Sequence, residues 1–398
     1  MSTQVLVLGG GYAGVMAADR LSQRADVAVT LVNPRPRFVE RVRLHQVAAG
    51  THRGLHDYAE VLADGVRVVV DAATRIDVAG HRVLLAGGAE LGYDRLVYAV
   101  GSSTADLGVP GVVEHALGVA TFEDATRLHT VLADAPGTPI VVVGGGPTGI
   151  ETAAELAESG RDVTLVCGGV LAPYFRPAAR RSLARRLARL GVTVLQQARA
   201  AEVRRGSVVL EDGRELMGLA VWAAGFRPSD LARRSGLTTD ADGRLLTDET
   251  LTCVDDDRVV GAGDAVAPSG VPPRASCQAA IPLGLRAAET LLARLEGRTP
   301  DPLDNVFFGQ CVALGRRAGT FQAARPDDTA VGLHVSGRAS SVLKETVTRQ
   351  TVRALAREAR RPGSMSQPSS SKARAATLRR ATGATGATPA PAQAKVVG

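Results

Sequence analysis

The sequence predicts an α/β protein with two Rossmann-like units, a small carboxyl-terminal region and a disordered tail. Two stretches of the same pattern carry this prediction: "VLVLGGGYAGVMAADRL" at residues 5–21 and "VVVGGGPTGIETAAEL" at residues 141–156. Each combines an apolar strand, a glycine cluster and small apolar residues at helical spacing, and another apolar stretch follows each of them. Strand, glycine turn, helix and strand in this order form the βαβ unit of a parallel sheet.

The first unit starts with a strand over residues 4–8. After its glycine cluster and helix, "VAVTLVN" supplies the second strand, which ends on Asn33. The stretch "VRVVVDAATRIDVAGHRVLLAGG" at residues 66–88 contains two short alternating segments, which predict an antiparallel hairpin over a parallel sheet.

Three later strands end on glycine, where the backbone must approach another group closely. They are "YDRLVYAVGS", which ends on Gly101, "AVWAAGFRPSD", which ends on Gly225, and "DRVVGAGDAVAP", which turns at Gly263 and presents Asp264.

The second unit opens with a helix over residues 121–134, for which Thr121 is the expected N-cap. Its βαβ unit closes with "DVTLVCGG", a strand that ends on Cys167. The next helix, "RPAARRSLARRLARL", places leucines on one face and its arginines mostly elsewhere, which predicts an outer helix with a solvated face. These arginines are Arg176, Arg180, Arg181, Arg185, Arg186 and Arg189.

The carboxyl-terminal region ends in a basic helix, and a low-complexity tail follows that we expect to be disordered. In the helix, Val342, Leu343, Val347, Leu355 and Ala359 form a loose apolar stripe that can lie on an anionic membrane or pack on its own protein. The predicted division is residues 1–108 and 229–304 for the first domain, 109–228 for the second, 305–361 for the carboxyl-terminal region and 362–398 for the tail.

Composition excludes several classes of protein. No apolar run approaches the roughly 20 residues of a membrane span, and the amino terminus enters a strand directly, so we expect a cytoplasmic protein. The four cysteines form no CxxC pair, which argues against a metal site or a dithiol centre. The net charge of +7 is carried by arginine, but only 3% of residues are aromatic, so no nucleic-acid partner is expected.

The glycine clusters indicate chemistry because each has the spacing GxGxxG between a strand and a helix. A turn without side chains lets backbone N–H groups and the positive end of the helix approach a pyrophosphate. Two such sites predict that a nicotinamide nucleotide delivers hydride to a second cofactor. That cofactor is expected to be a flavin, since the chain offers no metal site or dithiol to accept two electrons.

These motifs give the chain a clear resemblance to the two-dinucleotide-binding-domain flavoproteins, which have the pyridine nucleotide-disulfide reductase fold. "GGGYAG", "YAVGS", "GGGPTGIE", "AAGFRP" and "GAGDA" follow one another in the family's order between residues 4 and 290. Within this superfamily the chain is most similar to type II NADH dehydrogenases and apoptosis-inducing-factor-like oxidoreductases.

The resemblance implies FAD as the bound cofactor and NADH or NADPH as the hydride donor. It implies that Glu151 lies near the nicotinamide and the flavin, and that Gln278 polarises the flavin pyrimidine together with backbone groups. The residues that would bind the two nucleotides are Gly9, Gly11, Tyr12, Ala13, Gly14, Asn33, Gly101, Gly144, Gly146, Pro147, Thr148, Gly149, Gly225, Gly263, Asp264, Ala279 and Ala280.

Three features depart from the family pattern. The second strand of each unit commonly ends on an acid that binds a ribose, but here the strands end on Asn33 and Cys167. The choice between NADH and NADPH therefore stays open. Pro282 and Leu283 stand where type II dehydrogenases carry a glutamine pair beside the quinone, so a quinone is one candidate acceptor among small molecules.

The expected activity is thus that of an FAD-dependent NAD(P)H dehydrogenase that reduces a quinone or another small acceptor. A ferredoxin or small redox-protein reductase on the same fold is one alternative, and a slow flavin redox sensor is another. Peripheral contact with the inner face of the membrane and a homodimer are left open.

Overall fold

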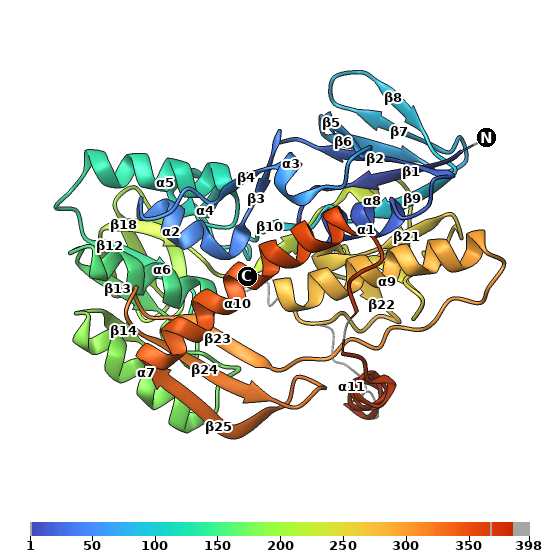
Figure 1. The fold of residues 1–398 in the computed structure, drawn as a ribbon. Helices are drawn as coiled ribbons and strands as arrows, with labels where there is room; N and C mark the ends of the chain where they lie inside the picture. Colours follow the sequence, from blue (N-terminus) through green and yellow to red (C-terminus); the bar gives the residue numbers. More distant parts are fainter. Residues whose placement is uncertain (1, 367, 385–398) are drawn as a thin grey trace.

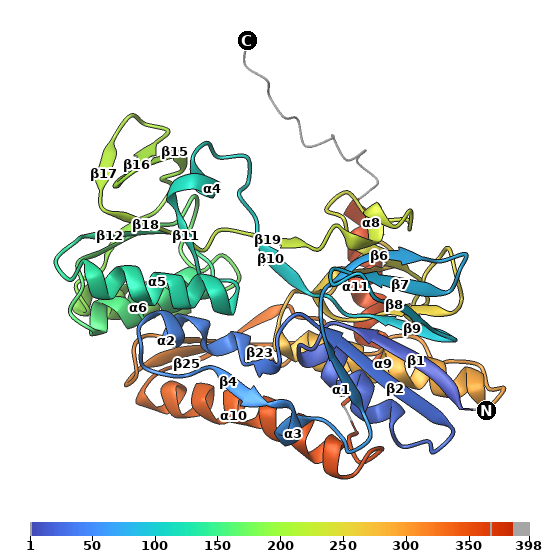
Figure 2. The ribbon, with the colours of Figure 1, turned by 90° about the horizontal axis from the view of Figure 1, so that it is seen from above.

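The computed structural model describes residues 2–366 and 368–384 of the 398-residue chain. Two parallel sheets lie side by side, and the long helix α10 (Arg338–Arg360) runs along both (Figures 1 and 2). The first sheet has the order β21-β9-β1-β2-β5, and all of its strand pairs are parallel. Its strands are β1 (Thr3–Leu8), β2 (Val27–Asn33), β5 (Arg67–Val70), β9 (Arg95–Tyr98) and β21 (Val259–Gly261).

Alternation along β1 builds the two faces of this sheet. Val5 and Val7 face a core that contains α1 (Tyr12–Leu21) and α9 (Cys277–Leu295). Leu6 and Leu8 face a second core, shared with an antiparallel sheet of β6 (Ala73–Asp77), β7 (Arg82–Leu85) and β8 (Glu90–Gly92). The expected hairpin is thus confirmed for β6 and β7, but β5, from the start of the same stretch, pairs in parallel with β2 instead.

The second sheet repeats this plan. Its order is β11-β18-β12-β13-β14, again with parallel pairs, and helices cover one face while a small antiparallel sheet covers the other. The parallel strands are β11 (Leu117–Gly118), β12 (Ile140–Val143), β13 (Val163–Val166), β14 (Thr193–Leu195) and β18 (Leu219–Trp222). The covering elements are α5 (Phe122–Asp134), α6 (Pro147–Glu158), α7 (Pro177–Arg189), α4 (Val112–His115), β15 (Ala200–Arg204), β16 (Ser207–Leu210) and β17 (Glu215–Met217). The predicted cap of α5 is confirmed, because Thr121 Oγ1 accepts from Asp124 N at 3.1 Å.

Shorter elements connect and complete the two units. The crossing between them is a ribbon of two antiparallel strands, β10 and β19 (Figure 2). The short elements are β3 (Arg37–Val39), η1 (Arg41–Arg43), α2 (Leu44–Ala48), β4 (Leu55–Asp57), α3 (Tyr58–Val61), β10 (Ser102–Thr104), β19 (Phe226–Pro228), α8 (Leu231–Arg234), β20 (Leu245–Thr247), η2 (Gly263–Ala265) and β22 (Val266–Pro268). The predicted domain limits at residues 108, 228 and 304 stay predictions.

The carboxyl-terminal region is an antiparallel sheet that leads into α10. Its strands are β23 (Gly309–Ala313), β24 (Gly319–Ala324) and β25 (Ala330–Gly337). The apolar stripe of α10 divides in two: Leu355 is fully buried in the core beside α1, whereas Val342 and Val347 are exposed. In the part of the chain that the structure describes, no helix is both long and apolar enough to cross a membrane.

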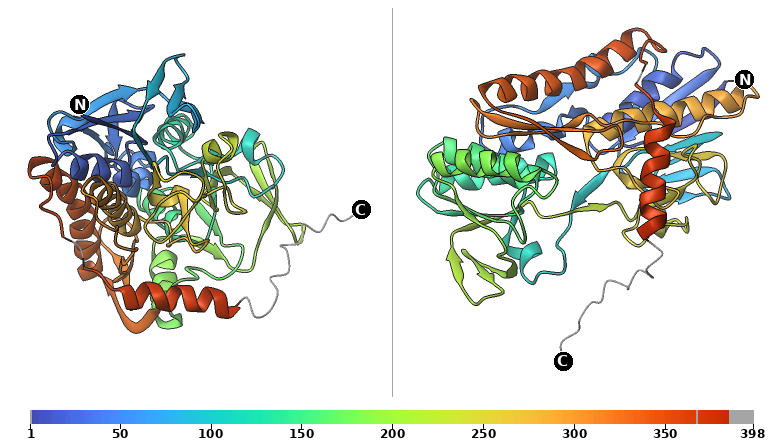
Figure 3. Two further views of the ribbon diagram at one scale, coloured as in Figure 1. Left: turned by 90° about the vertical axis from the view of Figure 1, so that its right-hand side faces the viewer. Right: turned by 90° about the horizontal axis from the view of Figure 1, so that it is seen from below.

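Part of the predicted disordered tail is a helix, which corrects that expectation. Residues Ser371–Ala384 form α11, which lies crosswise to α9 (Figure 3). The cause is a buried cation: the guanidinium group of Arg374 pairs with Glu249 and donates to the carbonyl groups of Pro268 and Val271. The prediction for residues 385–398 falls outside the described residues.

Candidate active site

The first glycine loop joins β1 to α1 and is very tightly packed. A Cβ on Gly9 would lie 2.3 Å from the Ala99 carbonyl oxygen, and one on Gly14 would lie 1.8 Å from the Gly9 carbonyl oxygen. Gly11 differs, since its φ of −87° suits any residue and a Cβ there would meet no described atom within 4 Å. The fold therefore requires the outer two glycines, while the middle one leaves open space in front of the helix.

The second loop, between β12 and α6, has the same construction. Cβ atoms on Gly144 and Gly149 would lie 2.6 and 1.9 Å from backbone oxygens. Gly146, with φ of −84°, would carry a Cβ that no described atom approaches within 4 Å. Open space at the positive end of a helix suits a phosphate group, so both loops fit a dinucleotide.

Several residues expected at the FAD site gather around the first loop. Asn33 Oδ1 accepts from Gly10 N at 3.0 Å, and its amide nitrogen donates to the Arg35 carbonyl at 2.8 Å. Asn33 thus fastens the loop itself, and its expected contact with the adenosine ribose stays a prediction. The ring of Tyr12 packs edge-on against Phe38, 5.2 Å between centroids, and both side chains belong to the core of the first unit.

Asp264 lies across the same site, beside two residues that sequence reasoning did not single out for a role. Its Oδ2 accepts from Ser102 Oγ at 2.9 Å and lies 3.7 Å from Arg41 Nη1. Gly101, at φ +70°, brings the backbone close to Arg41, and Gly263 brings it close to Ala13. The carboxylate therefore has polar partners but keeps lone pairs that can accept from a ribitol hydroxyl group.

The amino end of α9 is capped from within the protein. Ser276 accepts from the N–H groups of Ala279 and Ala280, which are the groups expected to face the flavin. In the amide orientation that satisfies its neighbours, Gln278 donates to the Gly309 carbonyl at 3.1 Å and accepts from Phe308 N at 3.3 Å. Gln278 therefore contacts the start of β23, and its expected role at the flavin stays a prediction.

Glu151 is buried on α6 and is the centre of a charged cluster. Its Oε1 lies 3.0 Å from Lys344 Nζ on α10 and accepts from Ala313 N on β23 at 2.9 Å, while Oε2 lies 3.7 Å from His45 Nδ1 on α2. Burial alone would raise the pKa of Glu151, but the charge of Lys344 and the hydrogen bond from Ala313 N help to outweigh burial, and the pKa is lowered. Burial lowers the pKa of His45 to about 4, against the opposing effect of Glu151. The cluster thus holds an ionised carboxylate, a lysine cation and a neutral imidazole.

Lys344 and His45 were not predicted as site residues. Only Lys344 is unusual in the sequence, because lysine is rare in this chain. It is one of three lysines in the chain, and the other two are Lys372 and Lys395.

The remaining predicted residues lie at the ends of strands and helices beside the glycine loops. Pro147 and Thr148 are the first residues of α6, and Gly225, at φ +78°, follows β18. Among the described residues, no group of His, Cys, Asp and Glu side chains is arranged to hold a metal ion.

Comparisons with known proteins agree with this geometry. The family model for pyridine nucleotide-disulphide oxidoreductases matches residues 3–282. An NADH dehydrogenase-like protein of Mycobacterium tuberculosis is 33% identical over 296 residues, which cover 67% of this chain and 73% of the relative. The type II NADH:quinone oxidoreductase Ndh of the same organism is 28% identical over 344 residues, with 75% and 74% covered.

Among solved structures, NDH2 of Plasmodium falciparum in complex with NADH superposes with a TM-score of 0.77 at 15% identity, with 91% of this chain and 99% of that chain covered. The expected fold and the expected oxidoreductase activity with FAD and a nicotinamide nucleotide are confirmed. The chain belongs to the pyridine nucleotide-disulphide oxidoreductase family.

Proposed function

We propose that this chain oxidises NADH and reduces a quinone, with FAD as its resident cofactor. The observation that carries the proposal is the pair Gly11 and Gly146, two glycines that the fold does not require and that leave space at the positive ends of α1 and α6. One dinucleotide site per helix is the arrangement that hydride transfer between two nucleotides needs. The names of the mycobacterial and plasmodial relatives support NADH as donor and quinone as acceptor.

FAD, when bound, accepts the hydride and supplies the electrons for the acceptor. The protein's own contribution is positioning and proton chemistry. The glycine loops orient the phosphate groups, and Asp264 accepts from a hydroxyl group of the cofactor. The pair of Glu151 and Lys344 holds a proton on Nζ beside an ionised carboxylate, so it can deliver that proton when quinone reduction consumes one.

Peripheral contact with the inner face of the membrane is part of this proposal. Large apolar side chains are exposed where β25 leads into α10: Leu333, Val335, Val342, Leu343 and Val347. Exposed apolar residues beside basic ones suit the surface of an anionic bilayer, where quinones reside. Replacing Leu333 and Val342 with serine should release the protein from vesicles in a flotation assay, and unchanged flotation would contradict the contact. A homodimer stays a prediction.

Two alanine variants test the proposed function. Gly11→Ala should fold but purify without yellow colour, whereas Gly146→Ala should stay yellow and bleach with NADH at least about tenfold more slowly under anaerobic conditions. Gly137→Ala is the matched control, because a Cβ there also meets no described atom within 4 Å but lies in a turn outside both loops.

The acceptor is tested by reoxidising the bleached protein with quinones, ferredoxin and oxygen in turn. Rapid reoxidation by quinones supports the proposal. A wild-type protein that stays colourless after reconstitution with FAD would refute it, and reoxidation by ferredoxin alone would refute the quinone.

A further inference from the structure

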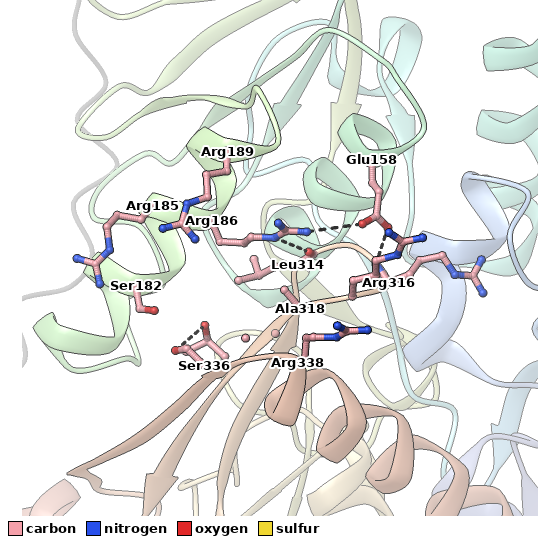
Figure 4. A pocket seen from close by; sticks show the side chains of 14 residues that line it. Glu158, Ser182, Arg185, Arg186, Arg189, Leu314, Arg316, Ala318, Ser336 and Arg338 are labelled. Carbon is pink, nitrogen blue, oxygen red and sulfur yellow. Dashed lines mark hydrogen bonds and ion pairs between the residues drawn. The ribbon is translucent and has the colours of Figure 1, made fainter.

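A basic pocket of about 890 Å³ lies between the carboxyl end of α6, the helix α7 and the carboxyl-terminal sheet (Figure 4). Six arginines and one carboxylate, Glu158, are its charged residues. The arginines are Arg185, Arg186 and Arg189 on α7, Arg316 and Arg317 in the turn between β23 and β24, and Arg338 at the start of α10. Half of the arginines expected to be a solvated face of α7 thus border a hollow shared with a distant part of the chain.

Glu158 joins the walls of this pocket. Its Oε1 lies 3.7 Å from Arg186 Nη2, and its Oε2 accepts from Arg316 N at 2.5 Å. Arg186 Nε also donates to the Leu314 carbonyl at 3.4 Å. The single carboxylate is therefore already used in holding α6, α7 and the β23–β24 turn together.

The other arginines have no such partner. Within residues 2–366 and 368–384, the guanidinium groups of Arg185, Arg189, Arg317 and Arg338 form no hydrogen bond or ion pair, and neither does that of Arg316, which meets Glu158 only through its backbone N–H. Some arginines elsewhere are paired with acids, as Arg82 is with Asp77 and Glu90. Five unpaired cations around one hollow repel one another, and a bound anion would remove that repulsion.

The lining residues define the chemical class of the anion. Guanidinium groups bind phosphate oxygens in pairs, and the hydroxyl group of Ser182 adds a further donor, while those of Thr320 and Ser336 pair with each other at 3.3 Å. The lining contains no aromatic side chain, so nothing there would stack on a nucleotide base. The volume and the number of arginines exceed what one inorganic phosphate needs.

The position separates this pocket from the nucleotide sites. The helix α6 begins at the second glycine loop and ends at Glu158, and its 12 residues span roughly 18 Å. We propose that this arginine pocket, lined by α7, the β23–β24 turn and the start of α10, binds a free compact polyanion with two or more linked phosphate groups.

The experiment is titration calorimetry of the full-length, FAD-loaded protein with tripolyphosphate at low ionic strength, with NAD⁺ present to occupy the nucleotide site. The test variant is Arg189→Gln with Arg338→Gln, and the control is Arg181→Gln, an exposed arginine of α7 outside the pocket. We expect binding at one site, at least about tenfold weaker in the double variant and unchanged in the control. Retained yellow colour and melting temperature show that each variant is folded.

Several results would overturn the proposal. They are no binding of tripolyphosphate by the wild type, equal weakening in the Arg181→Gln control, or sulfate binding as tightly as tripolyphosphate. The same variants are tested for binding to vesicles of phosphatidylglycerol and to a ferredoxin. If binding of one of these depends on Arg189 and Arg338 while binding of tripolyphosphate does not, the pocket belongs to a membrane surface or to an acidic protein instead.

Discussion

The two glycine loops share their tight turns but differ in how the rest of the protein encloses them. In the first loop Tyr12 and Ala13 are buried, and all ten residues of α1 are buried beneath Phe38 and α9. In the second loop Pro147 and Thr148 are half-buried at the open end of α6. An enclosed loop suits a cofactor that remains bound, and an open one suits a nucleotide that arrives and leaves.

The loops also differ at two positions where side chains decide the chemistry. Two residues beyond the third glycine, the first helix has buried Met16 and the second has Glu151. In the first unit the second strand ends on Asn33, and its amide group binds the loop. In the second unit the strand ends on Cys167, which packs so closely that a Cβ added to Gly145 would lie 2.8 Å from the Cys167 Cβ. The first loop thus suits a cofactor that remains bound, whereas the second opens the helix that carries Glu151.

The largest effect is expected from Gly14→Val, compared with Gly149→Val. Both Cβ atoms would lie within 2 Å of a backbone oxygen, at 1.8 and 1.9 Å. Because the two clashes are equally severe, each variant should lower the free energy of unfolding by at least about 3 kcal/mol. Only Gly14→Val should also remove FAD, whereas folded Gly149→Val should keep its yellow colour and lose reduction by NADH. Urea unfolding and absorbance spectra measure both, and equal loss of FAD in the two variants would contradict the comparison.

A smaller effect is expected from the charged pair that only the second helix has. Lys344→Met leaves the Glu151 carboxylate buried without its cation, which should cost about 2 kcal/mol, below the usual range because Lys344 is partly exposed. Adding Glu151→Gln should restore most of this stability, since Gln still accepts from Ala313 N. Urea unfolding of the two variants tests the coupling, and purely additive losses would show that the pair is not coupled.

The sequence predicts the framework well because hydrophobic periodicity and glycine spacing are local signals. The strands β1 and β12, their loops and the cap at Thr121 all follow from residues that lie within a few positions of one another. Hydrophobic periodicity does not identify which distant side chains form ion pairs with one another, however. Lys344 meets Glu151 from α10, and Arg374 orders α11 through Glu249, only because distant elements pack together.

The arginines of α7 illustrate the same limit. Their spacing correctly predicts an outer helix, with Leu183 and Leu187 buried. That Arg185 and Arg189 border a pocket depends on where the β23–β24 turn lies, and no periodicity within α7 carries that information.

A change in nucleotide preference is expected from an acid at the end of β13. Cys167→Asp should disfavour NADPH relative to NADH by about tenfold in kcat/KM, because the carboxylate repels a 2′-phosphate and accepts from the ribose hydroxyls. Asn33→Asp is the matched change in the first unit, and it should leave this ratio unchanged, since Asn33 Oδ1 already accepts from Gly10 N. Kinetics with both nucleotides would contradict this prediction if the ratio shifted equally in both variants.

The smallest effect concerns the acid side of the charged cluster. The pKa of His45 is lowered to about 4 by burial, so between pH 4 and about 6.5 the unfolded chain binds a proton that the folded chain does not. Stability linked to His45 is therefore complete above pH 6.5 and is lost as the pH falls, by about 1 kcal/mol at pH 5.5. His45→Gln should flatten this part of the profile when urea unfolding is compared at pH 7.5 and 5.5. An unchanged slope would mean that other groups facing the cluster, such as His52, cause the loss, because burial also lowers the pKa of His52.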